Sequence, residues 1–126
     1  MRLMEAKFKI ARENHSEAFK AIKSLAGKET IGDHFSWVNT KDFVKASSIK
    51  EAMEAWRWSP DFDEAGDIIG ITFKGEKLGD DKTFFEAIAP YVEAGSYIQM
   101  QGEDGEMWRW VFDGKTVKEI NPSVTW

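Results

Sequence analysis

The segment 102–115 constrains the fold of this chain more than any other, because it has the pattern of one strand between two tight turns. The sequence GEDG precedes the strand at 102–105, and DG follows it at 113–114. Asp-Gly between two strands is among the strongest short-range hairpin signals. Together with the alternating runs on either side, this pattern predicts a C-terminal three-stranded meander over 96–101, 106–112 and 116–120.

The central strand of this meander has one wholly aromatic face, made of Trp108, Trp110 and Phe112. Such a face is either a stacking platform for bases or sugars, or the core face of a sheet beneath helices. Stacking of nucleic acid requires basic charge nearby, whereas the surrounding half of the chain is acidic. We therefore favour the core, with Arg109 on the solvent side of the strand.

Alternating and helical spacings divide the first 60 residues. A strand is predicted first, with these inward residues: Met4, Ala6, Phe8 and Ile10. A helix capped by Asn14 or Ser16 and ended by Gly27 follows. A short strand is predicted at 34–39. Ser48 and Glu51 then form a capping box before a second helix, which Pro60 stops and whose inward face is Ile49, Ala52, Met53 and Trp56.

The next elements are a hairpin and a third helix. Ala65-Gly66 separates Phe62 from the run 68–73, and we expect these residues to face inward: Ile69, Ile71 and Phe73. Asp80 or Asp81 caps the third helix, whose apolar side is Phe84, Phe85, Ile88 and Val92. Pro90 should kink or restart that helix before Gly95 closes it.

The predicted order is β-α-β-α-β-β-α-β-β-β. With 126 residues and no linker or repeat, we expect one α+β domain over 1–126. A mostly antiparallel sheet with three helices on one face is the natural packing for this order. The absence of cysteine excludes disulfides and thiolate chemistry.

The later segments resemble a known group of proteins. The sequences EAIAPYVEAGSYI at 86–98, GEDG at 102–105 and WRWVFDG at 108–114 resemble an uncharacterised family of small acidic bacterial and phage proteins. The resemblance covers about the last third of the chain. It implies a bacterial or phage source and a cytosolic setting, and it implies no activity and no site residues.

Charge is unevenly distributed along the sequence. Residues 1–50 contain ten Lys and Arg against six Asp and Glu, a balance of +4, and residues 51–126 contain seven against sixteen, a balance of −9. Acidic clusters on one surface would attract a basic protein partner, although solvated turns are the alternative. The candidate partner-binding acids lie in two predicted turns: Asp61, Asp63, Glu64, Asp67, Glu103, Asp104 and Glu106.

Trp58 is a further candidate for partner binding. On a continued helix it would lie about 200° from the buried Trp56, as an exposed ring beside Arg57. Exposed tryptophan and arginine are typical of interface hot spots. Alternatively, the helix ends at Arg57 and Trp58 folds back over the core.

Metal and catalytic motifs are absent from the sequence. Asp61, Asp63 and Asp67 suggest a calcium loop, but the fifth and twelfth positions of an EF-hand would be Ala65 and Thr72. His15 and His34 are the only histidines, and no nucleophile elbow or phosphate loop accompanies them. We therefore expect no metal, no cofactor and no catalytic residue.

These observations favour a non-enzymatic protein-binding module, such as an inhibitor or immunity-type protein that acts on a basic bacterial partner through an acidic surface. The alternative is a small enzyme or ligand-binding protein with a pocket between the sheet and the helices. Nucleic acid is a weaker alternative, because only the first half is basic. The N-terminus has no apolar signal core and no apolar run reaches 18 residues, so we expect a cytoplasmic protein without a membrane partner.

Overall fold

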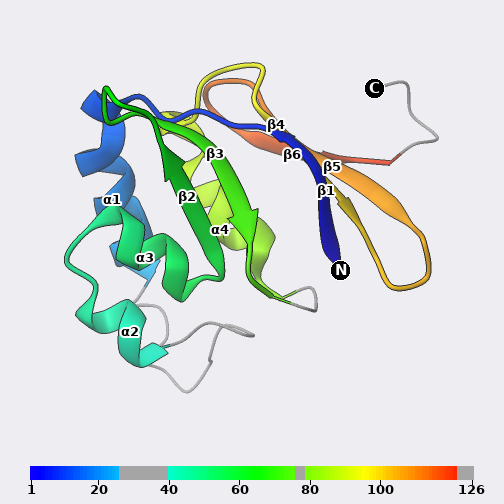
Figure 1. Cartoon of the computed structure of the whole chain (residues 1–126), viewed down its shortest axis with the longest axis horizontal. Coiled ribbons are helices and arrows are strands. Elements are labelled where there is room, and N and C mark those ends of the chain that lie inside the picture. Colours follow the sequence, from blue (N-terminus) through cyan, green and yellow to red (C-terminus); the bar gives the residue numbers. More distant parts are fainter. Residues whose placement is uncertain (26–39, 76–78, 122–126) are drawn as a thin grey trace.

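A computed structural model describes residues 1–25, 40–75 and 79–121 of the chain. Its largest element is a four-stranded antiparallel sheet with the strand order β1-β4-β5-β6 (Figure 1). The strands are β1 (Arg2–Lys7), β4 (Tyr97–Gln101), β5 (Met107–Phe112) and β6 (Val117–Ile120). Strands β4, β5 and β6 are the predicted meander, which is confirmed, and β1 adds to its β4 edge.

A separate two-stranded sheet is formed by β2 (Trp58–Phe62) and β3 (Ile68–Phe73). The predicted Ala65-Gly66 turn connects them, and Gly66 adopts a φ of +90° that favours glycine. Ile10, after β1, joins the two sheets through a pair of 3.0 Å backbone hydrogen bonds with Ile68.

Four α-helices lie in the described parts of the chain: α1 (His15–Ser24), α2 (Thr40–Lys45), α3 (Ile49–Ala55) and α4 (Asp81–Ile88). Helix α3 has the predicted capping box, since the Glu51 N–H donates to Ser48 Oγ at 3.2 Å. Hydrogen bonds from Ser47 to the Glu51 carboxylate lower the pKa of that group. Pro90 restarts the chain after α4 as a 3₁₀ turn, η3 (Ala89–Tyr91). A second 3₁₀ turn, η1 (Arg12–Asn14), precedes α1.

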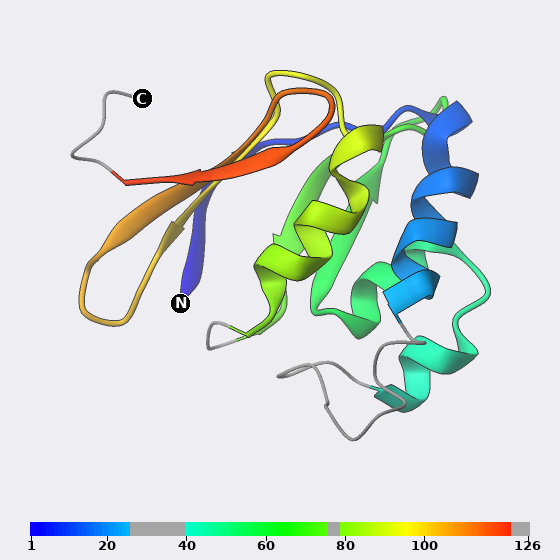
Figure 2. The ribbon, with the colours of Figure 1, turned by 180° about the vertical axis from the view of Figure 1, so that it is seen from behind.

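The core is an aromatic layer between α4 and the two sheets. Phe85 of α4 lies 5.0 Å from Trp110 and 5.9 Å from Phe112, centroid to centroid, and 4.9 Å from Trp58 of β2. All four rings are buried. Helix α4 is behind the β2–β3 hairpin in Figure 1 and in front of it in Figure 2. The prediction that the aromatic face of β5 is core is confirmed.

Two β-bulges displace the predicted inward faces. The pairing of β1 with β4 shifts between Leu3 and Glu5, so Met4 is exposed rather than inward. The pairing of β2 with β3 shifts in the same way between Asp61 and Phe62, and Ile69 is 51% exposed. The inward prediction was right for Ile71 and wrong for Met4 and Ile69, because an extra residue in one strand reverses the alternation.

The predicted order holds only in outline. The described parts give β-α-α-α-β-β-α-β-β-β, with α2 as an unpredicted helix, and the predicted strand at 34–39 lies outside the described residues. The sheet is also divided in two, because β2 and β3 pair only with each other as strands. The coarser expectation of an α+β fold with a mostly antiparallel sheet is confirmed.

Trp58 is buried, so the candidate of an exposed ring for partner binding is wrong, and the alternative that Trp58 folds back over the core is confirmed. Helix α3 ends at Ala55, and Arg57 then turns the chain into β2 through a φ of +74°, which is rare for a residue other than glycine. The Trp58 Nε1–H donates to the buried carboxylate of Asp81 at 2.9 Å, and Arg57 Nη2 donates to the same group at 3.1 Å. Trp58 therefore connects β2 to the start of α4 and is not available to a partner.

Candidate functional site

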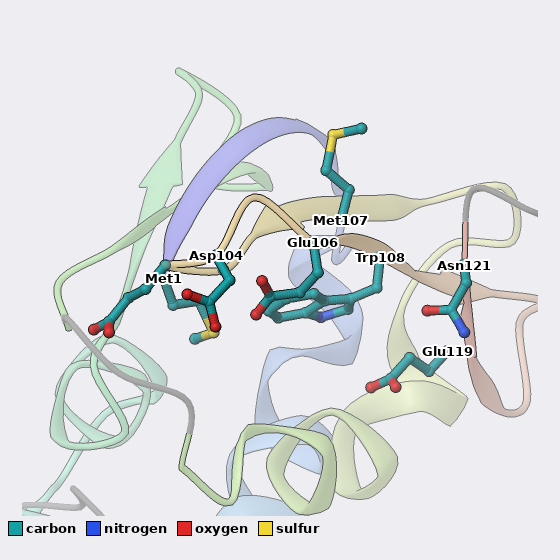
Figure 3. A pocket seen from close by; sticks show the side chains of 9 residues that line it. Met1, Asp104, Glu106, Met107, Trp108, Glu119 and Asn121 are labelled. Atoms are coloured by element: carbon teal, nitrogen blue, oxygen red, sulfur yellow. The ribbon is translucent and has the colours of Figure 1, made fainter.

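The four-stranded sheet extends beyond the helices, and an open cavity lies at its free end. In Figure 2 the β4–β5 hairpin and the start of β1 project away from α4. A cavity of about 490 Å³ lies there on the inner face of the sheet (Figure 3). Its lining residues come from the chain start, the β4–β5 turn, β5 and the end of β6: Met1, Gly102, Glu103, Asp104, Glu106, Met107, Trp108, Glu119 and Asn121.

Four carboxylates surround this cavity. Glu103, Asp104 and Glu106 are exposed, and none of them accepts a hydrogen bond from, or pairs with, any residue that the structure describes. The fourth, Glu119, accepts a 3.1 Å hydrogen bond from Trp110 Nε1. Mutual repulsion among unpaired carboxylates favours a cationic ligand, because a positive group would relieve it.

The β4–β5 turn holds its acids at the cavity through its glycines. The Gly102 N–H donates to the Glu106 carbonyl at 2.8 Å, and Gly105 has a φ of +86°. The Glu106 side chain folds over Gly102, where an added Cβ would clash with its carboxylate. The four-residue turn thus brings its acidic side chains back to the sheet end.

Trp108 is a buried donor without an acceptor at the wall of the cavity. The residue is 8% exposed, and its Nε1–H has no hydrogen-bond partner in the described structure. A buried polar group without a partner costs about 1–3 kcal/mol. Because this nitrogen is itself buried, an acceptor supplied by a ligand would reach it and remove this cost only after the atoms that cover it move.

The described carboxylates at the cavity are not clustered as metal ligands. Among the described residues, no lysine, arginine or histidine side chain lines the cavity. In the parts of the chain that the structure covers, no three His, Cys, Asp or Glu residues are grouped closely enough to hold a metal ion.

The acidic turn between β2 and β3 is different. Asp63 Oδ1 accepts from the Asp67 N–H at 2.9 Å, and Asp67 Oδ1 accepts from the Arg12 N–H at 2.7 Å. These two carboxylates hold the turn together and anchor it to the start of η1. Asp61 and Glu64 are exposed beside them.

The two acidic turns do not form one surface, which corrects the expectation of a shared acidic face. Figures 1 and 2 place the β2–β3 turn beside the start of α1 and the β4–β5 turn at the opposite end of the molecule. The reason is topological, because the two hairpins belong to different sheets, and the backbone bridge between these sheets in the described residues is that of Ile10 with Ile68. Asp61, Asp63, Glu64 and Asp67 are thus separated from Glu103, Asp104 and Glu106.

The remaining candidates add no further site. His15 Nε2 lies 2.9 Å from the Ile10 carbonyl, and its ring packs edge-on against Phe62. His34 lies outside the described residues. A second cavity of about 260 Å³ lies between α2 and α3, and its lining mixes acids with Lys45.

Sequence reasoning identified the turn acids but missed Glu119 and Asn121. Glu119 lies on the inner face of β6, and Asn121 lies just beyond the end of that strand. Glu119 pairs with Trp110, and this pairing would have placed Glu119 beside the aromatic face. The DG turn at 113–114 fixes that register, so the signal was present in the sequence.

No protein-family model, curated protein or solved structure matches the chain. Within the described residues, no helix has the length and apolar character needed to cross a membrane.

Proposed function

We propose that the chain is a non-enzymatic protein-binding module that accepts basic side chains of a partner protein in the cavity at the end of the sheet. The observation that carries this proposal is a cavity with three exposed carboxylates that pair with no described residue, and with no basic side chain of the described residues in its lining. The earlier expectation of an acidic binding surface is thereby narrowed to the β4–β5 turn and Glu119. An inhibitor or immunity-type role towards a basic bacterial protein remains the biological setting that we favour.

Charge and size support a basic peptide segment as the ligand. A volume of about 490 Å³ lies within the usual range of ligand pockets, roughly 300–1,000 Å³, and can hold one or two long side chains. Lysine and arginine bring donors that match carboxylate acceptors. Acids on the rim also attract a basic partner from a distance and so raise the association rate.

Trp108 favours a peptide over a simple polyamine. A peptide backbone brings carbonyl oxygens, and one of them can accept from the unpartnered Nε1–H of Trp108 once the rim side chains turn aside. A polyamine has cationic groups and no comparable acceptor. The alternative of an enzyme pocket between sheet and helices has less support, because the rings of Phe85, Trp110 and Phe112 pack together there.

The proposal is tested with the indole N–H resonances of the protein during titration with hexalysine, hexaarginine and hexaglutamate. The Trp108 resonance is identified through Trp108→Phe. We expect the two basic peptides to shift the Trp108 resonance and leave that of Trp58 in place, because Trp58 is already bonded to Asp81. Hexaglutamate should have no effect.

A matched pair of variants separates the cavity from overall charge. Glu103→Lys/Asp104→Lys should weaken peptide binding about tenfold or more, whereas Asp61→Lys/Glu64→Lys, with the same change of charge at the other turn, should change it by under about twofold. Equal weakening by both pairs, or no response of Trp108 to either basic peptide, would contradict the proposal. If spermidine shifts Trp108 as strongly as the peptides do, the site is one for small cations instead.

A further inference from the structure

The outer face of the four-stranded sheet is basic, although the chain as a whole has a formal charge of −5. Inward residues such as Ile98, Met100 and Trp110 are buried, so the residues that alternate with them point outward, away from α4. The charged residues on this outer face are four cations and one carboxylate: Arg2, Lys7, Arg109, Lys118 and Glu5.

The centre of this face is a cation–π stack. The Arg109 guanidinium lies 4.5 Å from the ring centroid of Tyr97, on the neighbouring strand. Arg109 Nε also donates to Gln99 Oε1 at 3.0 Å, and the Tyr97 hydroxyl donates to Glu5 at 2.8 Å. The hydrogen bond to Glu5 raises the pKa of Tyr97. The stack is therefore held in position from two sides.

Further cations lie around the stack. Arg2 donates twice to Gln101 Oε1, at 2.7 and 2.9 Å, so its partner is a neutral amide. Lys7 and Lys118 are exposed, and neither forms an ion pair with a described residue. Asp113, in the turn before β6, is the acid whose pKa Lys118 helps to lower, and it lies at the edge of the face.

We propose that the outer face of the β1-β4-β5-β6 sheet binds single-stranded nucleic acid. In this proposal a base stacks on the Arg109–Tyr97 pair, and the amides of Gln99 and Gln101 contact the edges of bases. Arg2, Lys7 and Lys118 contact phosphates. Guanidinium and aromatic planes are the groups on which unpaired bases stack, and a four-stranded sheet has room for roughly two or three bases.

The composition of the face favours a nucleic acid over a lipid surface or an acidic protein. A bilayer attracts clustered lysines together with protruding apolar side chains, whereas the centre of this face is a stack flanked by amides. An acidic protein would satisfy the cations and leave the stack without a function. The sequence alone disfavoured nucleic acid as a ligand. A count of charged residues along the chain combines these cations with acids that lie on turns, and so it does not reveal the basic face.

The inference is independent of the cavity. The acidic cavity lies on the inner side of the sheet and the basic stack on the outer side, so one can be occupied without the other. Charge reversal at Glu103 and Asp104 should therefore leave nucleic-acid binding intact or strengthen it.

The test measures fluorescence anisotropy of a labelled single-stranded RNA of mixed sequence, of the matching duplex and of heparin, at several salt concentrations. Wild type should bind the single strand more tightly than the duplex, with affinity that falls as salt rises. Lys7→Glu/Lys118→Glu should weaken binding at least tenfold and lower the salt slope by about one to two, since each lost phosphate contact lowers it by about one. Arg109→Gln should weaken binding about fivefold or more with less change in the slope.

The matched control is Lys20→Glu/Lys50→Glu, which changes the total charge equally at exposed positions on α1 and α3. It should weaken binding by under about twofold. The proposal is overturned if this control weakens binding as much as the sheet variant does, or if Arg109→Gln has no effect. Preference for the duplex or heparin, or binding to phosphatidylserine vesicles without binding to RNA, would also overturn it.

Discussion

Strand β5 carries two tryptophans on the same face, and the structure gives them different environments. Trp110 lies under Phe85 of α4, and its Nε1–H donates to Glu119. Trp108, two residues earlier, lies beyond the helix beside the cavity, and its Nε1–H has no partner in the described structure. Trp110 therefore stabilises the core, whereas Trp108, on the same face of the same strand, has a hydrogen-bond donor that the described structure does not use.

The acidic turns repeat this contrast. In the β2–β3 turn, Asp63 and Asp67 accept backbone hydrogen bonds. In the β4–β5 turn, the carboxylates of Glu103, Asp104 and Glu106 have no partner among the described residues. The carboxylates of the β2–β3 turn thus hold the fold together, whereas the exposed carboxylates beside the cavity have no such structural role among the described residues.

The largest expected effect is at the packed tryptophan. Trp110→Ala should lower the free energy of unfolding by roughly 3–5 kcal/mol, because it removes the ring that packs against both Phe85 and Trp58 and leaves a cavity. Urea denaturation measures this change, and a loss of that size can prevent folding altogether. A Trp110→Ala protein as stable as wild type would mean that the aromatic layer is not the core.

A milder pair of variants sharpens the comparison. Trp110→Phe should cost about 1–2 kcal/mol, because it removes the hydrogen bond to Glu119 and part of a packed ring. Trp108→Phe removes a donor that has no acceptor, so the free energy of unfolding should stay within about 0.5 kcal/mol of wild type or rise. Chemical denaturation of both proteins side by side decides this, and equal costs would remove the distinction between the two positions.

The sequence predicted the regular parts of this architecture well. The meander followed from turn chemistry at 102–105 and 113–114, and the start of α3 followed from the Ser48–Glu51 capping box. These signals are local, so a single sequence contains them in full. The core role of Trp110 also followed, because a strongly aromatic face has few other uses.

The errors have non-local causes. The bulges at Met4 and Ile69 depend on how each strand meets its partner, and the sequence of one strand does not reveal them. The sequence left two positions open for Trp58, an exposed ring or one folded over the core, because the left-handed turn at Arg57, stabilised by the distant Asp81, has no local signature. Only part of the candidate site was predicted. Its acids belong to one turn and can be read from the local sequence, whereas the position of that turn relative to the other hairpin depends on the whole fold.

The two acidic turns should respond differently to loss of a carboxylate. Asp67→Ala should cost about 0.5–1.5 kcal/mol, because the Arg12 N–H loses its acceptor and the turn loses its anchor. Asp104→Ala should leave the free energy of unfolding unchanged or raise it slightly, because it removes repulsion without breaking a described hydrogen bond. Thermal unfolding of the two variants measures the difference, and a larger loss at Asp104 would reverse the assignment of roles.

The smallest effect concerns acid stability at the third turn, between β5 and β6. Asp113 accepts hydrogen bonds from the backbone of Thr116 at 2.7 Å and of Lys115 at 2.9 Å, and these lower its pKa from 3.8 to about 2. Because the folded state holds the proton less tightly than the unfolded state does, this group stabilises the fold above about pH 4, and the contribution is lost as the pH falls towards 2. Asp113→Asn should therefore be less stable than wild type near neutral pH, and the gap between the two should close between pH 4 and 2. Thr116→Val keeps both backbone donors to Asp113. It should therefore retain most of the pH-dependent stability that Asp113→Asn loses, and urea unfolding of the two variants across this pH range measures the difference. A gap that stays constant with pH would show that Asp113 supports the turn through its shape rather than its charge.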